Sequence, residues 1–144
     1  MIGVNDSIMI TRPPSQVFAF LLDLNNIPKW QAEVVKSTVI TPGPTKVGTR
    51  FTEEVKMGPM RTTANCEVTG LVPDKEMAFR ATSSSIIYEG QVLVEPAENG
   101  SKLTLVGTAQ PKGFWRLLQP MMAGEFKKSV KKELVAIKGI LEKQ

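Results

Sequence analysis

Apolar and polar side chains alternate between residues 47 and 57, which is the period of a β-strand with one face in the core. The Gly58-Pro59 dipeptide that follows predicts a tight turn. Folding the chain back about that turn brings apolar residues together on one face and opposite charges together on the other, so this register predicts a β-hairpin. The expected pairs are Arg50 with Glu67, Phe51 with Cys66, Glu53 with Ala64 and Val55 with Thr62.

Three further turn signals divide the next part of the chain into four more strands. They are Pro73-Asp74, Ser84-Ser85 and the segment from Pro96 to Gly100. The resulting antiparallel meander has one mostly apolar face. The expected pairs are Val68 with Phe79, Ala81 with Tyr88, Phe79 with Gly90, Met77 with Val92, Val94 with Leu103, Val92 with Leu105 and Gly90 with Gly107.

The chain beyond Phe114 changes to the period of a helix. Apolar residues recur at spacings of three and four, and lysines occupy the opposite face, which predicts a long amphipathic helix that covers the sheet. Pro120 is expected to kink this helix or to separate a leading turn from its main body. The apolar stripe is Phe126, Val130, Leu134, Ile137 and Leu141, and the opposing lysines, all expected to be exposed, are Lys127, Lys128, Lys131, Lys132 and Lys138.

The opening of the chain has its own order of elements. An alternating run at residues 8–11 predicts a strand, and the paired prolines Pro13 and Pro14 predict the start of a helix. That helix is expected to stop near the asparagines at residues 25–26, and a second helical turn is expected to end at Trp30.

This opening resembles the polyketide cyclase/dehydrase and lipid-transfer superfamily, the START-related helix-grip proteins of the SRPBCC type. The resemblance extends over nearly the whole chain. Further motifs that carry it are Val47-Gly48-Thr49-Arg50-Phe51, the hairpin from Val94-Glu95-Pro96 to Gly100-Ser101-Lys102-Leu103-Thr104, and Pro111-Lys112-Gly113-Phe114. It implies an α+β helix-grip fold: a curved antiparallel sheet wrapped around a long C-terminal helix, with two short helices after the first strand. We expect residues 1–144 to form one such domain.

Relatives in this superfamily generally hold an apolar ligand between the sheet and the long helix. Strand phase and the family layout together predict the residues that would line such a site. They are Trp30, Phe51, Glu53, Val55, Cys66, Met77, Phe79, Tyr88, Gly90, Leu118, Met122, Phe126 and Val130. The paired glycines Gly90 and Gly107 are expected to leave space there, although the same residues could instead pack as a dry core, with the glycines only bending the sheet.

Two polar residues of this set are candidates for chemistry. Glu53 is the one charged residue on the apolar phase of its strand, and could act as an acid or base or hold a polar ligand group. The alternatives are a position at the cavity mouth in water, or a bulge that turns it outward. Tyr88 could bond a ligand carbonyl or a backbone group. Beyond these two candidates, no catalytic residue is assigned.

The composition excludes many kinds of chemistry. The chain has no histidine and a single cysteine, Cys66, which excludes Ser-His-Asp and Cys-His triads, His-based metal sites and cysteine-rich clusters. It has neither a glycine-rich dinucleotide fingerprint nor a P-loop. We expect no metal and no organic cofactor, and Cys66 is interpreted as a small core residue.

Charge and hydropathy limit the cellular locations and the partners that we expect. No apolar run is long enough for a membrane span, and no signal peptide is recognised, so a cytoplasmic location is expected. Residues 112–144 carry eight Lys/Arg and three Glu. Nucleic acid is not expected as a partner because the aromatic residues fall on the apolar phase. A solvated basic helix face is the simplest interpretation, with transient contact to an anionic membrane as the alternative. The pattern does not fix the oligomeric state.

The function predicted is therefore binding, with or without transport, of a hydrophobic or amphipathic small molecule in a cavity between sheet and helix. One alternative is an enzyme of the cyclase/dehydratase kind, in which Glu53 and Tyr88 transfer protons. A second is an accessory factor that docks on a larger enzyme or membrane complex. Neither composition nor pattern identifies the ligand.

Overall fold

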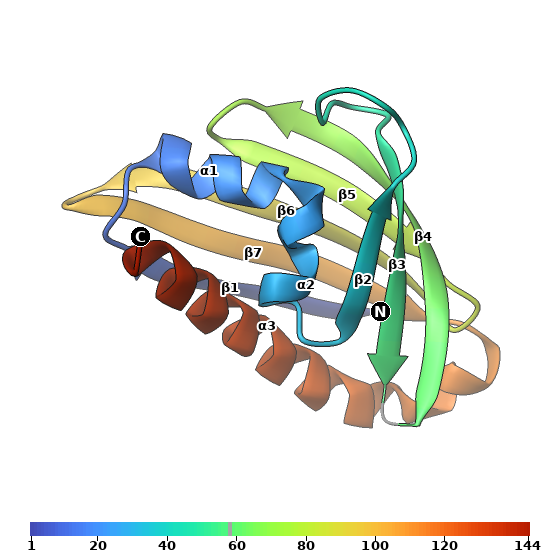
Figure 1. Cartoon of the computed structure of the whole chain (residues 1–144). Helices are drawn as coiled ribbons and strands as arrows, with labels where there is room; N and C mark the ends of the chain where they lie inside the picture. The colour runs from blue at the N-terminus through green and yellow to red at the C-terminus, as the bar shows by residue number, and fades with distance from the viewer. Residues whose placement is uncertain (58) are drawn as a thin grey trace.

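Seven strands form one antiparallel sheet in the order β1-β7-β6-β5-β4-β3-β2 (Figure 1). The computed structural model describes residues 1–57 and 59–144. Strong curvature gives the sheet a concave face. The strands are β1 (Ile2–Ile10), β2 (Val34–Val39), β3 (Arg50–Met57), β4 (Met60–Val72), β5 (Glu76–Thr82), β6 (Ile86–Ala97) and β7 (Gly100–Pro111).

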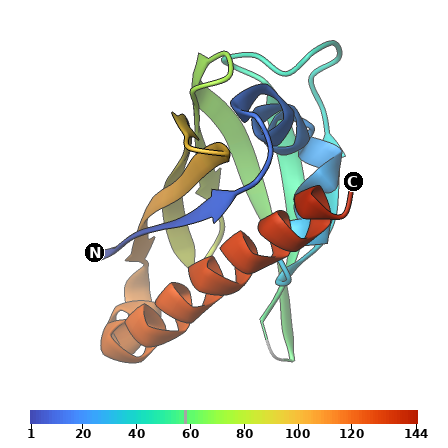
Figure 2. The same ribbon diagram turned by 90° about the vertical axis from the view of Figure 1, so that its left-hand side faces the viewer.

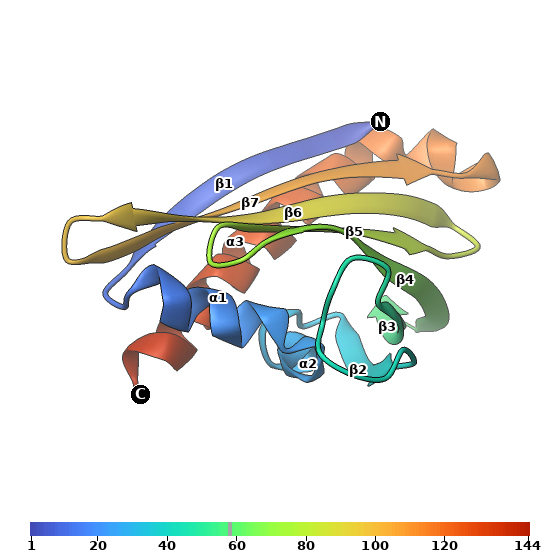
Figure 3. The ribbon, with the colours of Figure 1, turned by 90° about the horizontal axis from the view of Figure 1, so that it is seen from above.

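Helices cover the concave face. The long helix α3 (Gln119–Glu142) runs diagonally across it, and its C-terminal end lies near α1 (Figures 1 and 2). The other helical segments are α1 (Pro14–Leu22), η1 (Leu24–Asn26), α2 (Ile27–Trp30) and η2 (Gly113–Leu118). Seen from above, α1 and α2 lie on the same side of the sheet as α3 (Figure 3). The sheet, α3 and the α1–α2 segment therefore surround a common interior.

The helices begin where the prolines predict. Pro13 is extended and Pro14 opens α1, because proline fits the first turn of a helix, where its missing N–H has no intrahelical partner. Pro120 likewise lies in the first turn of α3 and separates this helix from the 3₁₀ turn η2. Helix α1 stops at Leu22, slightly before the asparagines, and the Asp23 side chain then caps η1 by accepting a hydrogen bond from the Asn25 N–H at 3.1 Å.

The predicted strand register is confirmed at every expected pair, from Arg50 with Glu67 to Gly90 with Gly107. The predicted turn at Gly58-Pro59 falls partly outside the described residues, because Gly58 is not among them. Since one residue of slip would move every apolar side chain to the outer face, the agreement shows that the buried pattern sets the register.

One strand start was predicted wrongly, and one strand was missed. The strand that contains Phe51 begins at Arg50 and not at Val47, which is 57% exposed. Gly48 has φ +94°, a left-handed conformation that ends the alternation before the strand begins. Strand β2 was not predicted at all. Its sequence, VVKSTV, is short, half polar and without strict alternation, and the strand lies at the sheet edge, where it pairs with β3 alone.

The apolar stripe of α3 packs inward, as predicted. Four of its residues are buried, and Phe126 is half-buried. Four of the five lysines are exposed, but Lys138 was predicted wrongly: it is half-buried, and its Nζ donates to the Met9 carbonyl and to Glu142. The reason is that the C-terminal half of α3 packs along β1 and brings this lysine against the strand backbone.

The C-terminus of α3 is also fixed to the start of α1. Arg12 donates to the carbonyls of Glu142 and Gln144, at 2.8 Å and 2.7 Å, and the Glu142 carboxylate accepts from Thr11. These bonds anchor one end of the helix over the sheet. Within the described residues, no helix is long and apolar enough to cross a membrane.

Candidate functional site

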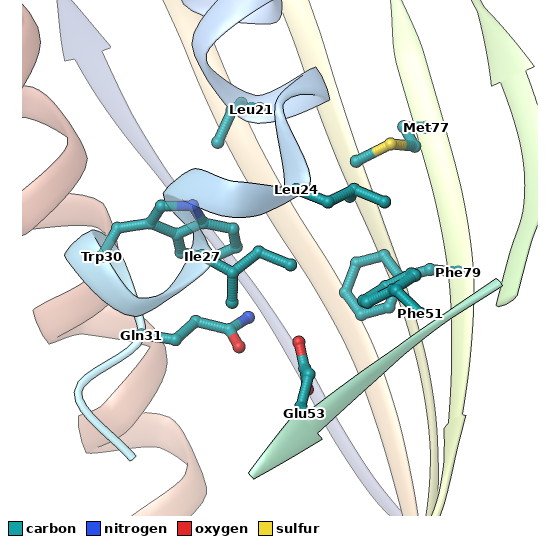
Figure 4. Close-up of a pocket in the computed structure, with 9 residues that line it drawn as sticks. All are labelled: Leu21, Leu24, Ile27, Trp30, Gln31, Phe51, Glu53, Met77 and Phe79. Atoms are coloured by element: carbon teal, nitrogen blue, oxygen red, sulfur yellow. The ribbon is translucent and has the colours of Figure 1, made fainter. Parts of the chain in front are cut away.

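A small cavity lies in the interior, between the α1–α2 segment and strands β3 and β5 (Figure 4). Its free volume is about 10 Å³, roughly the space of one water molecule. Glu53, Gln31 and Trp30 are the lining residues whose side chains carry polar groups, and the rest of the wall is apolar. The lining residues are Leu21, Leu24, Ile27, Trp30, Gln31, Phe51, Glu53, Met77 and Phe79.

Glu53 extends from β3 into this cavity (Figure 4) and is only 8% exposed. It pairs with Ala64 in an unbroken β3–β4 register, while its neighbour Glu54 is exposed. The sequence left two alternatives for Glu53, a bulge that turns it outward and a position in open water. The structure has neither at Glu53. Burial raises the pKa of the Glu53 carboxyl to about 7, and a hydrogen bond from the Cys66 thiol acts in the opposite direction.

Glu133 on α3 is a second interior carboxyl, and the sequence analysis missed it. It is half-buried, and burial, followed by the charges of Glu33 and Glu53, raises its pKa to about 8. A signal was present in the sequence: Glu133 lies seven residues after Phe126 and three after Val130, within the apolar stripe.

Glu33, on the segment between α2 and β2, is the third acidic residue of this region and was also missed. Its Oε1 accepts a hydrogen bond of 2.8 Å from Ser129 Oγ on α3. The charges of Glu33 and Glu53 both raise the pKa of Glu133, which places the three acidic residues in one region. They are named the acidic cluster below. Among residues 1–57 and 59–144, no group of acidic, cysteine or histidine side chains has the arrangement of a metal site.

Tyr88 on β6 stands between the sheet and α3. Its ring centroid lies 5.8 Å from that of Phe79 and 5.5 Å from that of Phe126, the latter in an edge-to-face arrangement. Burial, with the charges of Glu133 and Glu53, raises its pKa above the ordinary value for a phenol. The phenol is therefore neutral and available as a hydrogen-bond donor.

The space expected beside Gly90 and Gly107 is filled. A Cβ placed on Gly107 would lie 2.5 Å from the Tyr88 hydroxyl oxygen, and one placed on Gly90 would lie 2.7 Å from the Phe79 ring. The glycine pair is thus a socket for the Tyr88 ring, and the expectation of empty space was wrong. Sequence pattern could not show this, because the direction of a side chain depends on its rotamer.

Cys66 is buried on β4, and burial with the nearby Glu53 charge raises the pKa of its thiol. A neutral, buried thiol is a poor nucleophile, which agrees with the interpretation of Cys66 as a core residue.

The structure distributes the predicted site residues over four places. Trp30, Phe51, Glu53, Met77 and Phe79 line the cavity. Val55, Cys66, Tyr88, Phe126 and Val130 face the interior around it without lining it, and Leu118 and Met122 are half-exposed near the start of α3. Gly90 borders a different feature, an open groove of about 320 Å³ lined by outward residues such as Thr69, Glu89 and Gln91.

The cavity residues that were not predicted come from the first helical segments. Leu21, Leu24, Ile27 and Gln31 lie on or just after α1, η1 and α2. Strand phase gives no information about them, because it describes only the sheet side of the interior. A further polar feature is the indole N–H of Trp30, which is buried and has no hydrogen-bond acceptor among the described residues.

Comparison with solved structures gives close matches in fold. A protein from Thermus thermophilus superimposes with a TM-score of 0.82 at 18% identity, covering 96% of both chains. The ZhuI aromatase/cyclase from Streptomyces sp. R1128 has a TM-score of 0.82 at 14% identity, covering 97% of this chain and 93% of its own. A START superfamily protein from Mycobacterium smegmatis has a TM-score of 0.81 at 11% identity, covering 98% and 97%. At these identities the likeness concerns the fold alone.

Sequence comparison identifies the family. No curated protein matches the chain in sequence. The family described as polyketide cyclase/dehydrase and lipid transport matches it over residues 1–142. This match includes every strand and helix of the fold, and it agrees with the helix-grip architecture of the solved structures. The chain therefore belongs to the polyketide cyclase/dehydrase and lipid transport family.

Proposed function

We propose that the protein binds a hydrophobic or amphipathic small molecule in the interior between the sheet and α3. The observation that carries the proposal is Glu53, a carboxyl group held among apolar side chains with no basic partner among the described residues. Burying such a group without a partner destabilises the folded protein. Ionisable groups that are buried in this way are frequent at functional sites. A ligand with an apolar body and a polar end fits both the lining and the carboxyl group.

Binding requires the interior to open, because the free volume of about 10 Å³ holds no organic ligand. The half-buried aromatic residues Phe79, Tyr88 and Phe126 fill the space between sheet and helix. Tyr88 lies over its glycine socket and packs against the rings of Phe79 and Phe126. In this proposal the Tyr88 ring rotates out of the socket, and this movement opens space for the ligand.

Fluorescence of N-phenyl-1-naphthylamine, an uncharged probe that brightens in apolar surroundings, tests the proposal. We expect saturable binding in the micromolar range, and competition by medium-chain amphiphiles. Tyr88→Ala should bind more tightly or accept larger probes, because it vacates the socket over Gly90 and Gly107. Absence of saturable binding by the folded protein would refute the proposal.

The Trp115→Phe variant locates the probe. The chain has two tryptophans, so this variant leaves Trp30 as the single indole, inside the cavity. Bound probe should quench its emission, because energy transfer from an indole to this naphthylamine is efficient at short range. Probe binding without quenching of Trp30 would place the site elsewhere.

The start of α3 offers a surface for contact with an anionic membrane, from which the protein would take its ligand. Phe114, Leu117 and Met121 are 68%, 76% and 70% exposed, on η2 and the first turns of α3. Arg116 is exposed among them, and exposed lysines continue along the helix. Apolar side chains flanked by basic ones are the composition that binds an anionic lipid surface.

Vesicle sedimentation tests this contact. We expect binding to phosphatidylcholine vesicles that contain phosphatidylglycerol, and little binding to pure phosphatidylcholine. Leu117→Asp should reduce it severalfold, while Val135→Asp, also at an exposed apolar position of α3, should have a smaller effect. Equal loss in the two variants would show that net charge, and not this surface, determines binding.

A cyclase/dehydratase-type enzyme is the second candidate function, favoured by the pKa of Glu53 at about 7. A carboxyl group that titrates near the working pH can both accept and donate a proton, which is the requirement for general acid–base catalysis. In this function Glu53 removes a proton from the bound substrate, while Tyr88 donates a hydrogen bond. Glu53→Gln should then abolish turnover of any substrate found and leave its binding intact.

A further inference from the structure

The interior has an acidic character that the outer surface does not share. The chain carries a formal net charge of +4, yet the acidic cluster of Glu33, Glu53 and Glu133 lies around the interior. The ion pairs found in the described part of the chain involve other acidic residues, such as Glu67 and Glu142. No basic side chain lowers the pKa of Glu53 or Glu133. The interior therefore lacks a positive countercharge.

Basic residues that are partly buried do not supply it. Arg12 donates to backbone carbonyls at the C-terminus of the chain, Lys112 donates to the Ser83 carbonyl, and Lys138 donates to Met9 and Glu142. These three cations already have acceptors, which are backbone carbonyls and the Glu142 carboxylate. A positive charge close to the acidic cluster would have to come from a bound molecule.

Trp30 gives an independent indication that a polar ligand enters this cavity. Its side chain is 95% buried, lines the cavity together with Glu53, and its Nε1–H has no acceptor among the described residues. A buried donor without a partner destabilises the folded protein, because its hydrogen bond to water is lost and not replaced. A ligand atom that accepts from this indole would remove this destabilisation, so the cavity is suited to a molecule with polar atoms as well as an apolar body.

We propose that the ligand carries a protonated amino group at its polar end, bound by Glu53 and Glu133, and an acceptor atom for the Trp30 indole. This inference rests on the proposed function and specifies the class of ligand. An ammonium group supplies the missing countercharge, since an alkylamine, like a lysine side chain, stays protonated to about pH 10. A fatty acid would instead bring a negative charge beside Glu53 and Glu133, which disfavours its binding wherever these carboxyl groups are ionised.

The proposal predicts how affinity changes with pH. The titratable groups close enough for Glu53 to influence their pKa are Cys66 from β4, Tyr88 from β6 and Glu133 from α3, and Glu33 from the α2–β2 segment acts on Glu133; all are acidic or neutral. An ammonium ion favours the ionised carboxylates, so its binding releases protons when they begin protonated. Affinity for an amine should therefore rise from about pH 6 to about pH 9, while affinity for an alcohol should not rise.

Three ligands with the same alkyl chain form the test: decylamine, decanol and decanoate, kept below micellar concentration and measured by displacement of N-phenyl-1-naphthylamine. At about pH 8 decylamine should displace the probe at roughly tenfold lower concentration than decanol, the value of one charge-assisted bond, and decanoate should be weaker than decanol. The positive net charge of the protein would by itself favour decanoate, so the overall charge cannot produce this order.

Variants separate the cluster from the rest of the protein. Glu53→Gln and Glu133→Gln should each remove most of the preference for the amine and leave decanol unchanged. Glu54→Gln is the matched control, because Glu54 is the exposed neighbour on the outer face of the same strand. Should Glu53→Gln fail to fold, Glu133→Gln on the helix still gives the result.

The outcomes distinguish this inference from the proposed function. If the probe binds but decylamine and decanol compete equally, or decanoate competes best, the amine proposal is wrong and the binding function stands. If no probe binds, both are wrong. If the preference for the amine survives in both glutamine variants, the acidic cluster is not what recognises the ligand, and the proposal is also wrong.

Discussion

The burial of the Glu53 side chain has consequences for both ligand binding and stability. Its strand phase directs it inward, and the surrounding apolar residues give its carboxyl group a pKa of about 7. The folded protein therefore holds a proton that the unfolded chain, with a carboxyl pKa of 4.5, has already released. Glu133 behaves in the same way up to a pH of about 8.

The first prediction is that stability falls as the pH rises from about 5 to about 8. In this range the native state binds more protons than the unfolded state, so the free energy of unfolding decreases with pH. The shift at Glu53 corresponds to roughly 3 kcal/mol. Glu142 does not contribute, because its lowered pKa places its effect below this range. Urea unfolding at the two pH values measures the difference.

Glu53→Gln is the decisive variant for this prediction. It should be more stable than the wild type at about pH 8 and should show a smaller loss of stability between the two pH values. Glu54→Gln, at an exposed position, should behave as the wild type does. An unchanged pH dependence in Glu53→Gln would show that the carboxyl group is not protonated in the folded state.

The second prediction concerns the socket of Tyr88. Gly107→Ala should destabilise the protein by about 1–3 kcal/mol, because the three atoms nearest the new Cβ all belong to the Tyr88 side chain. Neither Gly107 nor Gly90 has a positive φ, so backbone strain does not contribute. In a Tyr88→Ala background the same substitution should be nearly neutral.

A double-mutant cycle measured by chemical unfolding gives the coupling between positions 88 and 107. Gly3→Ala is a suitable control, because a Cβ at Gly3 meets no atom within 4 Å. Additive effects of the two substitutions would contradict the packing of the tyrosine ring over the glycine pair.

At the residue scale, the sequence predicted what strand phase determines and missed what rotamers and tertiary contacts determine. The inward direction of Glu53 follows from alternation with period two, and the structure confirms it. The position of Glu133 in the apolar stripe of the helix could have indicated that its side chain points inward, but this residue was not considered. The Tyr88 socket and the unpartnered Trp30 N–H could not be predicted, because both depend on side-chain conformation.

At the element scale, strong apolar periodicity was predictive and weak periodicity was not. Strands β3–β7 and helix α3 have sustained patterns with clear turn signals, and their register and facing were predicted almost throughout. Strand β2 was missed because its order comes from pairing with β3 at the edge, and not from an apolar face of its own.

The third prediction is that α3 contributes to stability through one face alone. Ile137→Ala should cost about 2–5 kcal/mol, because Ile137 is completely buried against the sheet. Val135→Ala, two residues away and 58% exposed, should change the free energy of unfolding by less than about 0.5 kcal/mol. Equal effects at the two positions in urea unfolding would contradict the observed packing of the helix.

At the scale of the whole molecule, an anchored helix closes a curved sheet over an interior that is acidic and almost completely filled. The C-terminal end of α3 is fixed by Arg12 and Glu142, while its N-terminal half carries the half-buried Phe126. This asymmetry suggests that ligands enter near the beginning of α3, beside the exposed residues Phe114, Leu117 and Met121.

The most direct test of the account is whether a ligand reaches the cavity beside Trp30. Nitrogen-15 NMR of the Trp115→Phe protein contains one indole N–H signal, that of Trp30. With saturating decylamine we predict that this signal shifts, and that the alkyl protons show nuclear Overhauser contacts to Trp30 and to the Met77 methyl group, both in the cavity wall. An indole signal that does not move, with contacts only to surface residues, would contradict the claim that the interior is the binding site.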